Sequence, residues 1–269
     1  MSFDVEGKLM FLLSIFQSAI STPSNASPVQ GRKLALVIGN DAYQHVPQLE
    51  KAVGDADAVA HALKEIGFNV TEGTNLNFQQ TAALISDFEQ GLSKSDTVFF
   101  HFSGHGVQIK GDNILLPTDT PQPKDGQQGL VQRFGLSAES VLQDFNEKGA
   151  ALVVAVFDAC RDNPFAVVGT RGIGGSRGLA ALSPVEGTFV IYSAGVNQTA
   201  LDKLGSRDPE PTSVFTRVIL PLLKEPNLSL IEMAKRTQVK VRDLARTVGH
   251  LQTPAYYDQV VGNVTLVQR

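Results

Sequence analysis

The chain contains a single cysteine, Cys160, which follows an apolar run at residues 150–157. A histidine, His105, follows a second apolar run at residues 97–102 and lies 55 positions before the cysteine. A free thiol has a pKa of about 8.5, so it needs a neighbouring base to become a strong nucleophile near neutral pH. The pair therefore indicates acyl-transfer chemistry, in which Cys160 attacks a carbonyl carbon and His105 moves protons.

Glycines flank the histidine in the segment Ser103-Gly104-His105-Gly106. Glycine has no side chain, so a substrate can approach the backbone N–H of Gly106 closely. Together with the N–H of Cys160, we expect this group to hold the oxyanion of a tetrahedral intermediate.

Two alternatives use the same residues. A lone cysteine or histidine often serves only as part of the core. A metal site is the other alternative, because His101, His105, Asp158 and Cys160 are all possible ligands. No CxxC pair, and no HxxxH pair on a helix, supports a metal site. The matched positions of His105 and Cys160 after two apolar runs favour catalysis.

Alternating strand and helix patterns predict an α/β fold, with a mostly parallel sheet and helices on both faces. The strands are expected at residues 33–39, 68–71, 96–102, 150–157 and 187–192, with a hairpin arm at 111–117 and an edge strand at 262–267. The helices are expected at 55–66, 78–92, 138–148, 213–223 and 228–248. Functional sites in such sheets lie beyond the carboxyl ends of the strands, where we expect both His105 and Cys160.

The composition is that of one globular domain, which we place at residues 33–269. Residues 1–32 form a leader and linker, with an apolar stretch at 9–16 that resembles a signal peptide. The protein would be periplasmic or secreted if this leader is a signal, and cytoplasmic otherwise. The net charge of −4 argues against nucleic-acid binding, and no apolar run reaches the length of a membrane span.

Three segments carry a family resemblance: Leu36-Val37-Ile38-Gly39-Asn40 with Tyr43, Phe100-His101-Phe102-Ser103-Gly104-His105-Gly106, and Phe157-Asp158-Ala159-Cys160-Arg161. In order and spacing they resemble the caspase-like cysteine peptidases of clan CD, family C14, in the bacterial orthocaspase, metacaspase and paracaspase branch. The resemblance extends from about residue 33 to the C-terminus. It implies a caspase-like three-layer sandwich, with His105 as catalytic histidine, Cys160 as nucleophile, and the N–H groups of Gly106 and Cys160 as the oxyanion hole.

The residue two positions before the cysteine sets the expected specificity. Animal caspases have Gln-Ala-Cys-Arg-Gly, whereas this chain has Asp158 at the second position before Cys160. A carboxylate placed there on an extended segment lies about 6–7 Å from the nucleophile, near the side chain on the amino side of the cut bond, P1. The resemblance implies an S1 pocket of Asp55, Asp158 and Asp202 that selects arginine or lysine at P1. Surface positions are the alternative for Asp55 and Asp202.

The resemblance also implies a Cys/His dyad with protein or peptide substrates. Arg171 and Arg177, in the glycine-rich segment after Cys160, are candidate self-cleavage points. No cofactor is expected, and although metacaspases can depend on calcium, no acidic loop with calcium-ligand spacing is visible. Relatives occur as monomers or homodimers. The competing hypotheses are a catalytically silent binding module, a peptidase specific for aspartate, and another cysteine enzyme such as an esterase or transpeptidase.

Overall fold

The computed structural model describes residues 31–109, 111–124, 127–160, 185–196 and 198–268. Within them, one sheet has the main strand order β2-β1-β3-β6-β7-β8, and β4 and β5 extend it beyond the far end of β3. The strands are β1 (Lys33–Gly39), β2 (Asn69–Thr74), β3 (Thr97–Ile109), β4 (Asp112–Leu115), β5 (Leu136–Ser137), β6 (Leu152–Cys160), β7 (Thr188–Tyr192) and β8 (Ala255–Asp258). Neighbours along the main path are parallel except β8, which is antiparallel to β7.

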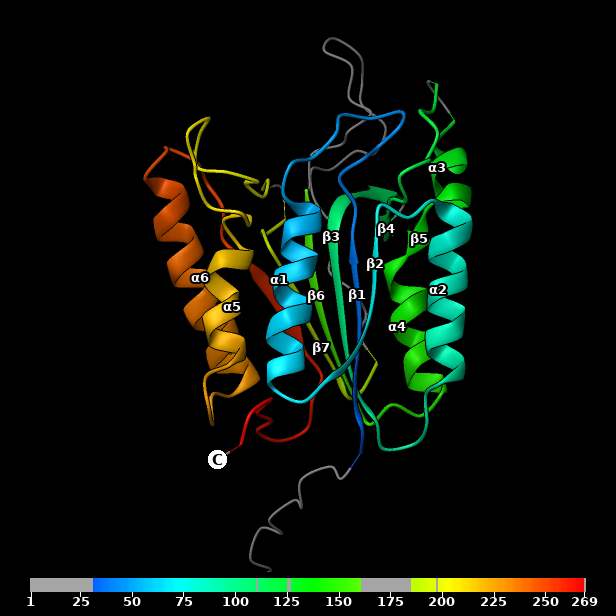
Figure 1. The fold of residues 1–269 in the computed structure, drawn as a ribbon, viewed down its shortest axis with the longest axis vertical. Helices are drawn as coiled ribbons and strands as arrows, with labels where there is room; N and C mark the ends of the chain where they lie inside the picture. Colours follow the sequence, from blue (N-terminus) through cyan, green and yellow to red (C-terminus); the bar gives the residue numbers. More distant parts are fainter. Residues whose placement is uncertain (1–30, 110, 125–126, 161–184, 197, 269) are drawn as a thin grey trace, which may run out of the picture.

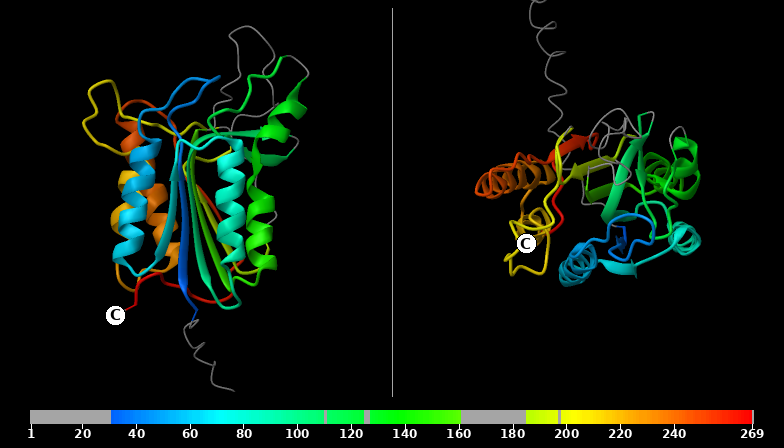
Figure 2. Two further views of the ribbon diagram at one scale, coloured as in Figure 1. Left: turned by 45° about the vertical axis from the view of Figure 1, so that its right-hand side comes forward. Right: turned by 90° about the horizontal axis from the view of Figure 1, so that it is seen from above.

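Helices cover both faces of this sheet, which confirms the predicted three-layer α/β architecture (Figures 1 and 2). One face is covered by α1 (Ala52–Glu65), α5 (Thr216–Leu223) and α6 (Leu230–Arg246), and the other by α2 (Phe78–Gln90) and α4 (Ala138–Glu147), with α3 (Gln128–Phe134) beside β5. Strands buried on both faces need apolar residues at nearly every position, which explains their continuous apolar runs.

Alternate residues of β3 belong to different layers of the core. Phe99 packs with residues of α1, α5 and α6, whereas Phe100 and Phe102 pack with residues of α2 and α4. Successive side chains of a strand point to opposite faces, so Ser103 lies on the same face as Phe99. Because the apolar residues of β3 are fixed by the core, the side chains of the polar residues that follow them also have fixed orientations.

The prediction that this strand ends near residue 102 is wrong, because β3 continues to Ile109. Up to His105 it pairs with β6, and from Gly106 onward it pairs with β4, the predicted hairpin arm. The polar residues after Phe102 resemble a loop in sequence, but backbone hydrogen bonds to two successive partner strands keep them extended. His105 thus lies inside a strand, and Cys160 is the last residue of β6 rather than the start of a loop.

The prediction of a last strand at residues 262–267 is also wrong. The edge strand is β8, and Thr265 makes only an isolated bridge with Ser229. Cross-strand aromatic contacts account for the choice: Tyr256 stacks on Phe189 at a centroid distance of 5.8 Å. Such pairs stabilise an antiparallel edge.

Helix α1 begins three residues before the predicted start. The carboxylate of Asp41 accepts hydrogen bonds from the backbone N–H groups of Ala52 (2.7 Å) and Val53 (3.1 Å). An acceptor supplied from outside the helix satisfies the first-turn donors in place of an N-cap side chain. Asp55 consequently lies in the first turn of α1.

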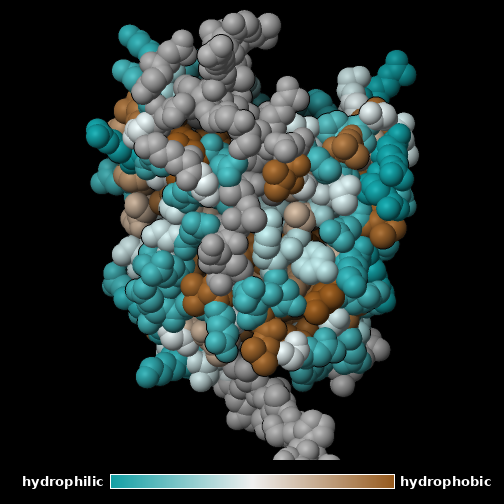
Figure 3. Space-filling model, turned by 180° about the vertical axis from the view of Figure 1, so that it is seen from behind, coloured by the Kyte–Doolittle hydropathy of each residue, from teal (hydrophilic) through white to brown (hydrophobic). Residues whose placement is uncertain are grey.

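None of the described helices has the length and apolar character needed to cross a membrane. On the face seen from behind, hydrophobic side chains form separate patches among hydrophilic ones (Figure 3).

Gly104 lies where β3 passes closest to neighbouring aromatic side chains. A Cβ atom there would lie 2.5 Å from Oη of Tyr43 and 3.1 Å from the ring of Phe102. We therefore predict that Gly104→Ala lowers the free energy of unfolding by about 1–3 kcal/mol, the usual cost of overpacking. Urea unfolding measures this value. In the control, Gly129→Ala, the added methyl group meets no atom within 4 Å, and no loss is expected. Equal stability of the two variants would contradict the prediction.

Candidate active site

The two predicted catalytic residues occupy opposite positions on neighbouring strands. In the parallel pairing of β3 with β6, His105 is in register with Cys160, and Ser103 with Asp158. Neighbouring strands lie about 4.8 Å apart, so these backbone positions are adjacent. The structure therefore brings together the histidine and the cysteine that the sequence places 55 residues apart.

A network of backbone and aromatic groups holds the histidine in place. The N–H of His105 donates to Oη of Tyr43 (2.8 Å), and this hydroxyl donates to the carbonyl of Leu116 (3.0 Å). The rings of Tyr43 and His105 pack at a centroid distance of 4.5 Å. Both side chains are buried. The imidazole thus has little freedom to change its orientation.

One contact determines which ring nitrogen of His105 carries a proton. Nε2 lies 2.8 Å from the backbone carbonyl oxygen of Pro47. A carbonyl oxygen can only accept, so Nε2 carries the proton in the neutral ring and Nδ1 is the basic nitrogen. The sequence gives no signal for this partner, because every residue has a carbonyl group. The sequence therefore did not point to Pro47, and it pointed to Tyr43 only as part of a family segment, without this orienting role.

His101 has a different environment from His105. It is fully buried, opposite Val37 and Val156 in the sheet, and burial lowers its pKa to about 4. Four residues of extended strand separate it from His105 by about 13 Å. In the described part of the chain, no group of three His, Cys, Asp or Glu residues is placed to hold a metal ion. At this separation His101 and His105 cannot bind the same metal ion.

The three predicted pocket acids line one small pocket. Asp55 comes from the first turn of α1, Asp158 from β6, and Asp202 from the segment between β7 and α5. The described lining residues are Leu49, Ala52, Asp55, Ser103, Gly104, Asp158, Ala200, Leu201, Asp202 and Ser213. Asp55 is buried, which contradicts the alternative of a surface position, whereas Asp202 is half-buried. The structure brings three carboxylates together in a pocket whose strand residues, Ser103 and Asp158, lie two positions before His105 and Cys160.

Ser213 connects two of these acids. Its backbone N–H donates to Asp55 (2.8 Å), and its hydroxyl donates to Asp158 (2.5 Å). The hydroxyl of Ser103 also donates to Asp55 (2.9 Å), and that of Thr216 to Asp158 (3.0 Å). All four donors are neutral, so they orient the carboxylates without cancelling their charge. Ser213 is a further pocket residue that sequence analysis did not identify.

Burial and mutual repulsion disfavour negative charge on the pocket carboxyl groups. Burial raises the pKa of Asp55 well above its ordinary value, and the nearby Asp158 raises it further. Burial also raises the pKa of Asp158, against the opposing effect of its hydroxyl donors. The pKa of Asp202 is raised by burial, and the positive charge of Lys51 opposes this shift. A cation that entered this pocket would relieve the repulsion.

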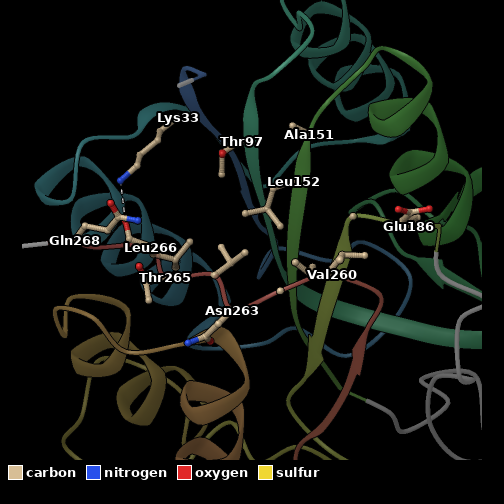
Figure 4. A pocket seen from close by; sticks show the side chains of 14 residues that line it. Lys33, Thr97, Ala151, Leu152, Glu186, Val260, Asn263, Thr265, Leu266 and Gln268 are labelled. Atoms are coloured by element: carbon tan, nitrogen blue, oxygen red, sulfur yellow. Dashed lines mark hydrogen bonds between the residues drawn. The ribbon is translucent and has the colours of Figure 1, made fainter. Parts of the chain in front are cut away.

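A larger hollow lies at the opposite end of the sheet (Figure 4). Lys33, Thr97 and Leu152, the first residues of β1, β3 and β6, line it together with the C-terminal segment 260–268. The amine of Lys33 donates to the carbonyl of Leu266 (2.7 Å). Its described lining residues include no cysteine or histidine.

Comparisons with known proteins agree with this geometry. The model of the Peptidase C14 family, described as a caspase domain, matches residues 32–264. Human mucosa-associated lymphoid tissue lymphoma translocation protein 1 is 26% identical over 134 residues, which cover 50% of this chain and 16% of that protein. Metacaspase-5 of Trypanosoma brucei brucei is 29% identical over 177 residues, covering 54% of this chain and 32% of that protein.

Caspase-1-B of Xenopus laevis is 26% identical over 140 residues, covering 49% of this chain and 35% of that protein. The matches thus span about a third or less of the length of these curated relatives. The family match covers most of the chain, from the start of β1 past the end of β8. The resemblance predicted from the three segments is confirmed, and the chain belongs to the caspase-domain family of C14 peptidases.

Proposed function

We propose that the protein is a cysteine endopeptidase in which Cys160 is the nucleophile and His105 the general acid and base. The register of the two residues supports this assignment, and so does the protonated Nε2 that the Pro47 carbonyl fixes. With Nε2 holding its proton, Nδ1 is the nitrogen that exchanges protons with thiol and substrate. The peptidase family of the chain agrees with this reaction class.

The reaction is acyl transfer in two halves. The thiol proton of Cys160 passes to His105, the thiolate sulfur bonds to the carbonyl carbon, and the oxyanion lies against the N–H groups of Gly106 and Cys160. The C–N bond then breaks, and the amine leaves with the proton from His105. In the second half His105 takes a proton from water, the hydroxide attacks the thioester, and the C–S bond breaks to restore the thiol. The scheme assigns no step to a metal ion or cofactor.

The acidic pocket supports the second part of the proposal, that the substrates have a basic residue at P1. Asp55, Asp158 and Asp202 line it, two residues or about 6–7 Å along the strands from the His105–Cys160 pair. This is about the reach of a P1 side chain from the bond being cut. An arginine presents a planar fork that pairs with carboxylates in two hydrogen bonds, so we expect arginine first, lysine second, and aspartate excluded by repulsion.

We predict hydrolysis of fluorogenic peptides that end in arginine or lysine and none of the matched aspartyl peptide. Asp158→Asn should lower kcat/KM for the arginyl peptide by about 30-fold or more, since unpairing a buried charge costs about 2–5 kcal/mol. Cys160→Ala is the blank, and Asp87→Asn, an exposed change on α2, is the control. Preferred cleavage after aspartate would overturn the pocket assignment. Silence on every peptide, with a thiol no more reactive than free cysteine, would favour a binding module.

The raised pocket pKa values predict a pH dependence of binding. Burial raises the pKa of both Asp55 and Asp158, so the pocket holds protons at pH values where an exposed aspartate is already ionised. A protonated carboxyl attracts a guanidinium less, so KM for the arginyl peptide should fall as pH rises through these pKa values and then level off. Initial rates across the acid and neutral range measure it. A KM that does not change with pH would contradict the prediction.

The same shift predicts an effect on stability. Asp55 has a raised pKa in the folded chain, so its ionisation destabilises the fold. This penalty is absent below the ordinary aspartate pKa, develops as pH rises to the raised value, and is complete above it. Asp55→Asn should therefore raise Tm at neutral pH, and the gain should shrink as pH falls. Melting curves over pH, with Asp87→Asn as control, test the sign; a lower Tm at neutral pH would refute it.

Self-cleavage is a further part of the proposal. Arg171 and Arg177, the candidate sites, lie outside the described residues, in the connection between β6 and β7. A peptidase that selects basic P1 residues would be able to cut there, in its own chain or another copy. Incubation of the wild-type chain should yield fragments that end at one of these arginines in mass spectra. Fragments that also appear with Cys160→Ala, or an intact wild-type chain, would count against self-cleavage.

A further inference from the structure

The segment between β7 and α5 supplies four residues to the acidic pocket, including Ala200 and Leu201, although its described residues form no helix or strand. Asp202 and Ser213 both line the pocket, and exposed residues at 205–207 separate them. Irregular backbone keeps its position only through specific contacts. Contacts with other elements hold parts of this segment, such as the hydrogen bond from the N–H of Leu201 to Gln252, but four hydrogen bonds end on one carboxylate, that of Asp208.

Asp208 accepts hydrogen bonds from both sides of its own loop. The backbone N–H of Leu204 donates to it at 2.7 Å and that of Glu210 at 3.2 Å. Its side chain is 4% exposed. Arg217, in α5, pairs with both of its oxygens, through Nη1 at 3.2 Å and Nη2 at 2.7 Å. A bidentate pair of this kind fixes orientation as well as distance.

The guanidinium of Arg217 also holds the residues next to the pocket. Nη2 donates to the carbonyl of Thr212 (2.8 Å), and Nε donates to the carbonyl of Ser213 (3.1 Å). Ser213 in turn donates its N–H to Asp55 and its hydroxyl to Asp158. One continuous chain of hydrogen bonds thus leads from Arg217 through Ser213 to two pocket acids.

Lys51 connects the same cluster to the other wall of the pocket. Its Nζ is buried and lies 3.5 Å from Oδ2 of Asp208. Lys51 directly precedes α1, the helix that carries Asp55. Asp208 therefore links three parts of the structure: the start of α1, the β7–α5 segment and α5 itself.

We propose that Asp208 and Arg217 are positioning residues for P1 recognition, which hold Ser213 and the β7–α5 segment so that the pocket carboxylates meet a basic side chain. The described residues that line the pocket include neither of them. They therefore act through Ser213 and the β7–α5 segment rather than on the substrate. This inference rests on the proposed preference for basic P1 residues.

The test compares Arg217→Lys and Asp208→Asn with wild type on the arginyl peptide. Lysine keeps the positive charge, but its three donors on one nitrogen cannot replace the four hydrogen bonds of Arg217 or its bidentate pairing. We expect KM to rise about tenfold while kcat changes by less than about twofold, the pattern of lost binding in both ground and transition states. Arg32→Lys is the control, because Arg32 pairs with Asp96 through Nε (3.1 Å) and Nη2 (2.6 Å) at the opposite end of the sheet.

Two readouts separate positioning from a general structural role. Hydrogen bonds from Ser213 lower the pKa of Asp55 and Asp158, so loosening Ser213 should move the acid limb of the KM–pH profile to higher pH. The rate at which iodoacetamide alkylates Cys160 should stay at the wild-type value. If Arg217→Lys melts far below Arg32→Lys, the comparison is made with Asp208→Asn, which retains the shape of the side chain.

Each outcome decides the proposal. A raised KM, a shifted acid limb and unchanged alkylation support it. An unchanged KM in a folded variant overturns it, and so does a joint loss of kcat and alkylation, which would mean that the pair only maintains the fold. Wild-type protein that cleaves no arginyl peptide would overturn the proposed function, and this inference with it, before any variant is compared.

Discussion

β3 and β6 pair in parallel over nine residues, from Thr97 opposite Leu152 to His105 opposite Cys160. Because side chains alternate along a strand, a slip of one residue would turn every side chain of one strand to the wrong face. Apolar packing on both faces prevents such a slip; the rings of Phe100 and Phe157, for example, meet at 5.6 Å. The core thereby sets the position of the histidine and of the cysteine. All further features of the site are built around this register.

The acidic pocket places carboxyl groups where their ionisation is unfavourable. Asp55 and Asp158 are buried side by side, and burial raises the pKa of each. The hydroxyl and N–H donors around them make the arrangement possible but supply no positive charge. A bound cation would stabilise the ionised carboxylates, which supports the proposal that this pocket serves substrate recognition rather than stability. The proposed role of Asp208 and Arg217 agrees with this. Carboxylates that repel one another stay close only when the groups that bind them, such as Ser213, are held in place.

Periodic sequence patterns predicted the alternating elements, and the family resemblance pointed to the proposed dyad and to three acids, which the structure places in one pocket. They did not predict the continuation of β3 to Ile109, since glycine and polar residues normally mark a loop. Nor did they reveal the Pro47 carbonyl or the Arg217 contacts. Backbone groups have no sequence signature, and an ion pair within an irregular segment has no period. The contacts that hold the candidate site residues in place were therefore not predictable from the sequence.

The most direct measurement is covalent labelling of Cys160 by matched peptidyl ketone inhibitors that carry arginine or aspartate at P1, followed by intact-mass analysis and peptide mapping. The account predicts one adduct on Cys160 with the arginyl reagent, none with the aspartyl reagent, and loss of the adduct in His105→Ala. The chain has only this cysteine, so the stoichiometry is unambiguous. Equal labelling by both reagents, or labelling that survives in His105→Ala, would contradict a dyad joined to an acidic pocket.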